Sequence, residues 1–338
     1  MSIFTVPAPS FFGASPRGEA SATGGSPAQT AGPRSPGARR RLKGLTQHPL
    51  YGFVLLFLSA FIFSVMIAAV KLATPHVPVG QLVFCRFFLG FAALSAVRSA
   101  GLVAFAPVNR GGLLLRGLFG GVAVLCYFVA VYGGTITNAA VLNSTYPMFV
   151  AMFSAVYIGE RVRGRLILPL AAAFLGVVLI ISPAGDTPRL SDLAGLVSGV
   201  CAGLAILTVR RLRKTDSVWT IVYYFNIVGS ALTAPLLVAD AALPSAKGAM
   251  FAVLVSLLAN LAQFLLTTAY RHTRAAEGSV VTLTTPVFSA AWGVLLFGEP
   301  LGAAKALGGA LVLGTGFFLS ASSRENSRSR KESRRRRA

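Results

Sequence analysis

The sequence predicts an all-α integral membrane protein in which ten transmembrane helices form two inverted five-helix repeats. Only 12% of the 338 residues are charged and 54% are hydrophobic, whereas a soluble domain usually carries about a quarter charged residues. Apolar stretches long enough to cross a bilayer recur along most of the chain. The second half of the chain also repeats the first half at a fixed shift.

Composition and motifs exclude several classes of protein. A mean hydropathy of +0.70 over the whole chain indicates many spans rather than one anchor. The net charge of +21 resembles that of a nucleic-acid-binding protein, but the basic residues lie in short clusters between apolar runs. We therefore expect a lipid bilayer around the protein and no nucleic-acid partner. Cys85, Cys126 and Cys201 lie in apolar stretches without a C-x-x-C spacing, which indicates packing rather than a metal site.

We expect neither an enzyme nor a cofactor. No hydrolase or nucleotide-binding motif is present, and the three histidines lie far apart in the sequence. The sequence therefore offers no catalytic residues and no metal ligands.

The chain divides into four predicted segments. Residues 1–47 are rich in Pro, Gly, Ser and Ala and are expected to form a disordered cytoplasmic tail, although a transit peptide or a mis-assigned start codon would also explain them. The first repeat covers 51–183, the second covers 191–322, and a basic cytoplasmic tail covers 323–338.

The ten predicted spans contain about 17 to 22 residues each, enough to cross about 30 Å of hydrocarbon as a helix. They cover residues 52–71, 79–97, 112–132, 138–158, 166–182, 193–209, 218–238, 248–270, 278–298 and 302–321.

Positive charge supports this topology. With these spans, 24 Lys and Arg residues fall in the loops and tails of one face and only four on the other. Arg116, Arg210 and Arg213 are counted among the 24 as loop residues. Because Lys and Arg are retained on the cytoplasmic side, we expect a multi-pass protein of the bacterial inner (plasma) membrane with both termini in the cytoplasm.

A shift of 139 residues aligns the two halves. It places Pro147 on Pro286, and it places Gly159 and Glu160 on Gly298 and Glu299. Each repeat holds five spans, an odd number, so the second copy must enter the membrane from the opposite face. Inverted repeats of this kind recur in secondary transporters, which bind their substrate near the midplane between the halves.

Two segments then carry a resemblance to a known family. Residues 140–160 read AVLNSTYPMF through IGE, and residues 279–299 read SVVTLTTPVF through FGE. This pattern resembles the ten-helix, EamA-type branch of the drug/metabolite transporter superfamily over about residues 51–322. The resemblance implies alternating access across the inner membrane for a small polar metabolite, whether amino-acid-like, nucleotide-like or vitamin-like. The alternative is a non-transporting sensor or scaffold with the same fold.

Arg86 is the most informative single residue because it lies about seven residues inside the second span. A cation at that depth costs several kcal/mol unless it is solvated or paired, so it should face the interior. It either binds a carboxylate or phosphate of the small-molecule substrate, or caps carbonyls that a helix break releases.

Pro147 and Pro286 each free a carbonyl near the midplane and bend their helices. We expect the turns beside them to face one another and to bind substrate, or to form interhelical hydrogen bonds. These turns contain Asn143, Thr145 and Tyr146 in the first repeat and Thr282, Thr284 and Thr285 in the second.

Other polar and aromatic residues are further substrate-binding candidates. They are Tyr127, Tyr224, Asn226, Asn260, Gln263 and Trp292. Asn260, Gln263 and Thr267 share one helix face, which should be internal. Tyr and Trp also mark membrane interfaces, so that alternative stays open for the aromatic residues.

Glu160 and Glu299 are expected at the C-terminal ends of their helices, where a negative charge opposes the helix dipole. Nearby cations, Lys305 in the case of Glu299, are the expected compensation, and a gating role is the alternative. Glycines in the fifth and tenth spans, such as Gly176 and Gly309, indicate close helix packing or the face of a homodimer.

Overall fold

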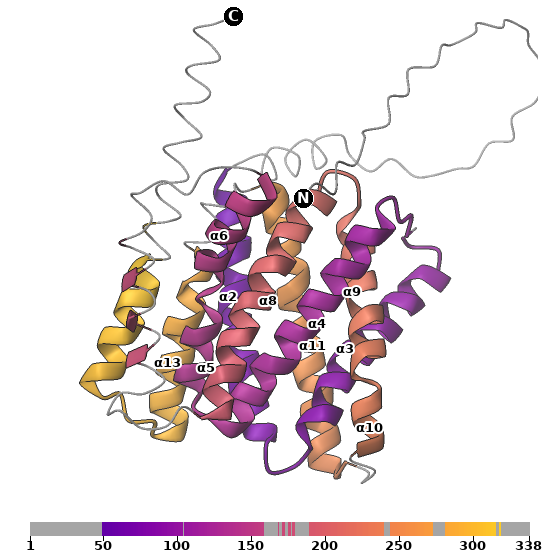
Figure 1. Ribbon diagram of the computed structural model, residues 1–338. Coiled ribbons are helices and arrows are strands. Elements are labelled where there is room, and N and C mark those ends of the chain that lie inside the picture. Colours follow the sequence, from indigo (N-terminus) through magenta and orange to yellow (C-terminus); the bar gives the residue numbers. More distant parts are fainter. Residues whose placement is uncertain are drawn as a thin grey trace, which may run out of the picture. The chain divides into compact units, whose positions relative to one another are not determined.

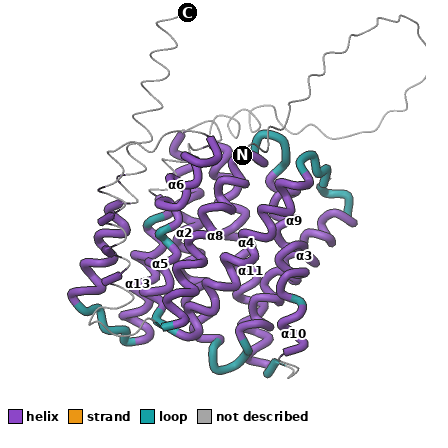
Figure 2. Tube along the Cα trace, in the orientation of Figure 1, coloured by secondary structure: helices purple, strands orange, loops and turns teal. Residues whose placement is uncertain are grey.

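The computed structural model describes residues 49–103, 105–158, 189–239, 244–272 and 281–315, together with the isolated helical positions 168, 171–172, 175–176, 178–179 and 318. Every regular element within these residues is a helix (Figures 1 and 2). The two predicted tails, Glu160 and most of the predicted span over 166–182 lie outside the described residues.

The helices follow the predicted apolar stretches. The first half contains α2 (Pro49–Ala73), α3 (Val79–Ser99), α4 (Arg110–Gly133), α5 (Ile136–Asn143) and α6 (Tyr146–Ile158). The second half contains α8 (Leu190–Leu212), α9 (Val218–Thr233), α10 (Pro235–Ala239), α11 (Ala246–His272) and α13 (Thr284–Phe297), followed by the helix Ala303–Thr315.

Five of the described helices are long and apolar enough to cross a membrane. They contain Tyr51–Ala73, Val79–Ser99, Arg110–Gly133, Leu190–Leu212 and Ala246–Tyr270. The all-helical architecture is therefore confirmed, whereas the count of ten spans stays a prediction. Large apolar side chains such as Val54, Leu257 and Leu295 are exposed on the outside of the bundle, as expected where lipid replaces water around the helices.

Short polar residues start several helices. The side chain of Asn109 accepts a hydrogen bond from the Gly112 amide at the start of α4, and Thr135 accepts one from the Asn138 amide at the start of α5. Ser217 does the same for α9. These side chains accept hydrogen bonds from backbone amides that have no partner inside the helix, so they fix the residue at which each helix begins.

Contacts between helices of the two halves recur between their repeat equivalents. α4 packs along α8, and α2 packs along α11. The shift of 139 residues aligns α2 with α8 and α4 with α11. The contact between α4 and α8 is therefore the repeat equivalent of the contact between α11 and α2. The contacts of α4 with α9 and of α11 with α3 form a second exchanged pair. The two halves therefore pack as related copies.

Hydrogen bonds and contacts at the helix ends give the helix directions. Lys71, near the end of α2, donates hydrogen bonds to the carbonyls of Val131 (2.9 Å) and Gly134 (2.6 Å) at the end of α4, so α2 and α4 run in the same direction. Ser191, at the start of α8, lies against Gly133 at the end of α4. α8 is therefore antiparallel to α4, and the equivalent helices α2 and α8 run in opposite directions.

Gly117 allows α4 to approach α9 closely. A Cβ atom at this position would lie 2.4 Å from the Cβ of Val228, which is closer than packed carbons allow. We expect Gly117→Ala to lower the free energy of unfolding by about 1–3 kcal/mol, the usual cost of overpacking. Thermal denaturation of the purified protein in detergent measures this. The control is Gly111→Ala on the same helix, where a Cβ meets nothing within 4 Å; equal melting temperatures for the two variants would contradict the close approach.

Candidate functional site

Both proline-containing spans break just before their proline. α5 ends at Asn143 and α6 begins at Tyr146, which leaves Ser144 and Thr145 in a turn ahead of Pro147. In the second half, residues 281–282 are helical, Leu283 is a turn and α13 begins at Thr284, ahead of Pro286. Figure 2 shows the first break as a loop segment between α5 and α6.

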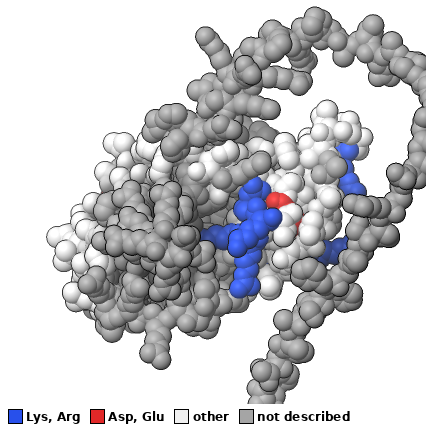
Figure 3. Space-filling model, turned by 90° about the horizontal axis from the view of Figure 1, so that it is seen from above, with Lys and Arg blue, Asp and Glu red and all other residues white. Residues whose placement is uncertain are grey.

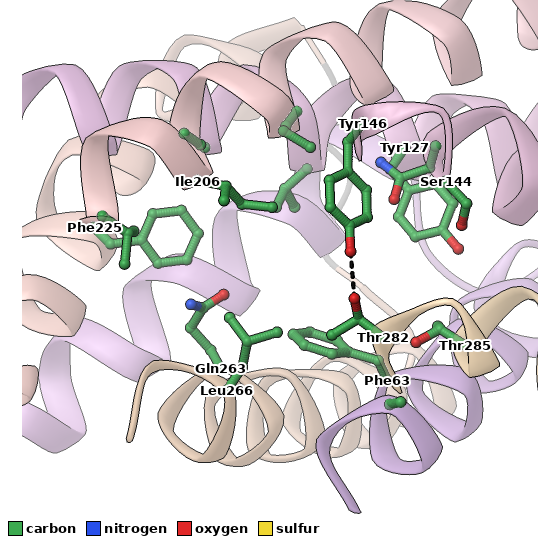
Figure 4. A pocket seen from close by; sticks show the side chains of 18 of the residues that line it. Phe63, Tyr127, Ser144, Tyr146, Ile206, Phe225, Gln263, Leu266, Thr282 and Thr285 are labelled. Carbon is green, nitrogen blue, oxygen red and sulfur yellow. Dashed lines mark hydrogen bonds between the residues drawn. The ribbon is translucent and has the colours of Figure 1, made fainter. Parts of the chain in front are cut away.

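The two breaks meet inside the bundle. The hydroxyl groups of Tyr146 and Thr282 form a hydrogen bond across the interface between the two halves (Figure 4). Thr145 is not part of this hydrogen bond; its hydroxyl donates to the carbonyl of Leu142 (2.7 Å) in α5 and lies against Gly199 of α8. The expected approach of the two turns is therefore present, and Tyr146 and Thr282 make it.

A cavity of about 320 Å³ lies beside this hydrogen bond. Residues from both halves line it, from α2, α3, α4, α5, α6, α8, α9 and α11 and from the segment at Thr282 and Thr285. Seven of the predicted substrate-binding residues are among the lining residues. These are Arg86, Tyr127, Asn143, Tyr146, Gln263, Thr282 and Thr285.

Four arginines line the cavity, and no Asp or Glu within the described residues does so. Arg86 comes from α3, Arg116 from α4 and Arg210 from the end of α8, while Arg213 caps the C-terminus of α8. Tyrosine, threonine, serine and amide side chains provide the remaining polar lining, and alanine, aromatic and aliphatic residues make most of the wall. The cavity is consequently both partly apolar and strongly positive.

Arg86 and Arg116 both contact one aromatic side chain, Phe225. The guanidinium carbon of Arg116 is 4.1 Å from the centre of the Phe225 ring, and that of Arg86 is 5.5 Å from the same centre. Arg86 also lies over the Phe87 ring at 4.6 Å. Cation–π contacts offset part of the cost of burying a guanidinium group, but they leave its N–H donors unused.

Both arginines are buried, and both have N–H groups without a hydrogen-bond partner among the described residues. Arg86 is 3% exposed and Arg116 is 6% exposed. Within the described residues, Nε and one terminal nitrogen of Arg86 and Nε of Arg116 have no hydrogen-bond partner. Arg86 therefore caps none of the described carbonyls through these atoms, which weakens the structural explanation for its place in the span.

The side-chain amide of Asn260 holds the α3 backbone at Arg86, and the side-chain amide of Asn226 holds Asn260. Asn260 donates to the carbonyl of Arg86 (3.2 Å) and accepts from the amide of Asn226 (2.9 Å). Gly90 leaves the space for these amides, because a Cβ there would lie 2.4–2.7 Å from their oxygen and nitrogen atoms. Asn226 and Asn260 are thus tied to the helix interface and are not among the lining residues.

The remaining candidates also lie outside the lining. Trp292 donates from Nε1 to the hydroxyl of Ser64 (3.1 Å), and Tyr224 packs beside the cluster of Leu113, Leu212 and Ile221. Pro147 and Pro286 lie in the first turns of α6 and α13 and shape the breaks.

Arg116, Arg210 and Arg213 correct the loop assignment. The charge count predicts loop positions for all three, whereas the structure places Arg116 and Arg210 within helices and all three against the cavity. For Arg116 a signal was present, because the residue already falls inside the predicted span over 112–132. For Arg210 the signal is the repeat itself, since the 139-residue shift places it on Lys71, a residue at the end of a span.

Glu299 has partners other than the expected Lys305. Its carboxylate accepts hydrogen bonds from the Ile136 amide (2.6 Å), the Thr137 amide (3.1 Å) and the Thr137 hydroxyl (2.7 Å). These groups form the N-terminus of α5, whose dipole favours a negative charge. Glu299 therefore joins the end of α13 to the start of α5, and the dipole of its own helix is not what determines its place.

The end of the bundle near Arg210 and Arg213 is basic. The last turn of α8, which contains Arg211, and the connection to α9, which contains Arg213 and Lys214, lie at the top of Figure 1. Seen from above, Lys and Arg side chains gather near the middle of the view (Figure 3). No group of three or more metal-ligating side chains occurs in the part of the chain that the structure describes.

Comparisons with known proteins point to one family. Residues 50–182 and 189–321 each match the EamA-like transporter family. The chain is 32% identical over 253 residues to the pseudopaline exporter CntI of Pseudomonas aeruginosa, with 73% of this chain and 88% of that protein covered.

Two further likenesses are more distant. The riboflavin transporter of Rhizobium johnstonii is 27% identical over 195 residues, with 55% of this chain and 63% of that protein covered. A crystal structure aligns with a TM-score of 0.58 and 20% identity over 80% of this chain and 96% of the other, which shows a shared fold.

Proposed function

Because the chain belongs to the EamA-like transporter family, we propose that it is a secondary transporter that moves a small polar metabolite across the bacterial inner membrane by alternating access. Proteins of this family are transporters and not enzymes, and this chain is a multi-pass membrane protein. The proposal includes two inverted repeats of five spans each and cytoplasmic termini.

The observation that carries the proposal is a cavity enclosed by the equivalent helices of both halves. α2 and α8 line it, as do α3 and α9, and α4 and α11. A site between two inverted halves can face either side of the membrane when the halves rock about it. The antiparallel directions of α2 and α8 support this arrangement.

The repeat-equivalent residues Lys71 and Arg210 lie in different surroundings at the two ends of the bundle. At the end that holds Lys71 and Glu299, side chains tie the helix termini together through hydrogen bonds. At the other end, Arg210, the repeat equivalent of Lys71, lines the cavity. The same repeat position therefore bonds to helix termini at one end and faces the cavity at the other. The Arg210 end is also held together, because the Asp216 carboxylate accepts hydrogen bonds from the amides of Val108 (2.8 Å) and Asn109 (3.3 Å) at the start of α4.

The family does not determine the solute. The two named relatives concern pseudopaline and riboflavin, two different solutes. The solute class must therefore come from the cavity of this chain.

Filling the cavity tests the proposal. Ala123, on α4, is buried and lines the cavity, so Ala123→Trp should obstruct it. Cells that express the wild-type chain are expected to redistribute at least one metabolite between cytoplasm and medium relative to cells without it, as measured by untargeted mass spectrometry. Ala123→Trp should remove most of that difference at equal abundance in the membrane.

Leu118→Trp is the matched control. Leu118 lies on the same helix, is 42% exposed on the outside of the bundle, and should keep full activity as tryptophan. Equal redistribution by Ala123→Trp and the wild type would show that the cavity is not the path, and no redistribution by the wild type would favour a non-transporting sensor or scaffold.

A further inference from the structure

The positive lining of the cavity points to a specific class of solute. Resting on the transport function proposed above, we propose that the cavity binds a solute with at least two anionic groups, carboxylates or phosphates, one held between Arg86 and Arg116 and the other by Arg210. The argument depends on the positions, the unused donors and the surroundings of these three side chains.

Arg86 and Arg116 form the inner anion site. Both guanidinium groups contact the ring of Phe225, and both keep buried N–H donors without a partner in the described part of the chain. A buried and unpaired cation costs several kcal/mol, and two neighbouring cations add mutual repulsion. An anion placed between them would accept the unused donors in charge-assisted hydrogen bonds, which are the stronger kind.

The local backbone makes room for this site. A Cβ on Gly120 would lie 1.8 Å from a terminal nitrogen of Arg116 and 2.7 Å from the Phe225 ring. The guanidinium group of Arg116 therefore lies over the backbone of Gly120, which has no side chain and follows Arg116 by one turn of α4. Any larger residue at position 120 would displace it from Phe225 and from the cavity.

Arg210 provides a second, separate anion site. It comes from the end of α8, lines the same cavity and has a buried Nε without a partner in the described residues. The hydroxyl groups of Tyr146 and Tyr270 lie within electrostatic range of it. Arg210 is not part of the Phe225 pair, so a solute that reaches both sites needs an anionic group at each end.

The rest of the lining favours a small solute with an uncharged middle. Besides the arginines, the wall contains Ala123, Ala205, Ile206 and Phe63, together with Gln263 and the Tyr146–Thr282 pair. Figure 4 shows Gln263, Tyr146 and Thr282 around the same open space. No carboxylate among the described residues lines the cavity to attract a cationic solute.

Graded anions test the proposal on purified full-length protein. Acetate, succinate, citrate and pyrophosphate are added at constant ionic strength, with glucose and putrescine as neutral and cationic solutes, and the melting temperature is recorded. We expect succinate, citrate and pyrophosphate to stabilise the protein with apparent Kd values at least about tenfold below that of acetate, a step worth one charge-assisted contact. Glucose and putrescine should have no effect. Comparison of citrate with pyrophosphate distinguishes carboxylate from phosphate solutes.

Arginine variants separate the two sites. Arg210→Gln should abolish the preference for succinate over acetate, whereas Arg86→Gln should weaken the binding of all anions. Arg211→Gln and Arg98→Gln are the matched controls, because both residues are exposed neighbours outside the lining, and both should behave as the wild type. If an arginine variant does not fold, competition of the same solutes against radiolabelled citrate on the wild-type protein provides the ranking.

The outcomes also separate this proposal from transport itself. If stabilisation is equal for acetate and citrate, or absent for every polyanion, the two-anion site is wrong. If glucose or putrescine binds and Ala123→Trp blocks that binding, transport stands and the anion site is wrong. If polyanions bind as expected but none enters proteoliposomes that contain the protein, the anion site stands and transport is wrong.

Discussion

Arg86→Met is expected to abolish solute redistribution and to raise the melting temperature of the protein. The loss of activity and the gain in stability have the same cause, the removal of a buried cation. Arg86 is buried beside Arg116, with donors that no described group satisfies. Replacement of buried charged groups by apolar side chains of similar volume often stabilises proteins by about 1–4 kcal/mol. The same replacement removes the inner anion contact, so solute binding is lost.

Differential scanning fluorimetry and the redistribution assay measure the two effects on the same preparation. Arg98→Met, on the exposed end of the same helix, serves as the control and should change neither. A lower melting temperature with normal redistribution would mean that Arg86 has a structural role and would contradict the assignment.

Glu299→Ala is expected to destabilise the protein by about 3 kcal/mol, in the range for removing one partner of a buried charged network. The substitution leaves the amides of Ile136 and Thr137 without their acceptor, and it removes the negative charge near Lys71. Glu299→Gln should lie between the wild type and Glu299→Ala, because the amide oxygen still accepts a hydrogen bond while the NH₂ group faces other donors.

Urea titration or thermal denaturation in detergent measures the order of the three proteins. Lys305→Ala is the informative control, since Lys305 is the cation that sequence proximity alone would pair with Glu299. Lys305→Ala should have the stability of the wild type. If it is as damaging as Glu299→Ala, the carboxylate depends on Lys305 and not on the start of α5.

Helix positions could be predicted from the sequence because lipid imposes a simple requirement. A span needs an uninterrupted apolar stretch of a known length, and α2, α3, α4, α8 and α11 lie close to the predicted stretches. The breaks before Pro147 and Pro286 were also predictable, because proline removes a backbone donor and disfavours a helical residue before it.

The partners of charged residues could not be predicted in the same way. Glu299 bonds to residues more than 160 positions earlier in the chain, and neither hydropathy nor a local charge pattern reports such a contact. The charge of Arg116 favours a loop, whereas its position within an apolar stretch favours the span, and the structure places it in α4. Tertiary packing decides whether a cation near the end of a span turns outward or into the cavity.

Two polar residues on the same helix face also differ in their partners. Gln263 and Asn260 share a helix face, yet Gln263 lines the cavity and Asn260 bonds to the α3 backbone. The periodicity identified the internal face correctly, since both side chains point into the bundle. Which of the two meets the solute depends on where α3 crosses α11, and the sequence does not specify that crossing.

The position of the Arg116 guanidinium over Gly120 has a consequence for evolution. Arg116 and Gly120, four residues apart on α4, depend on each other, because replacing either residue alone disturbs the contact of the guanidinium group with the Phe225 ring. Lineages that retain the arginine are expected to retain the glycine, and lineages that lose one are free to lose both. Under the anion site proposed above, the pattern R-x-x-x-G near the start of the third span is expected to mark those related carriers that move anionic solutes.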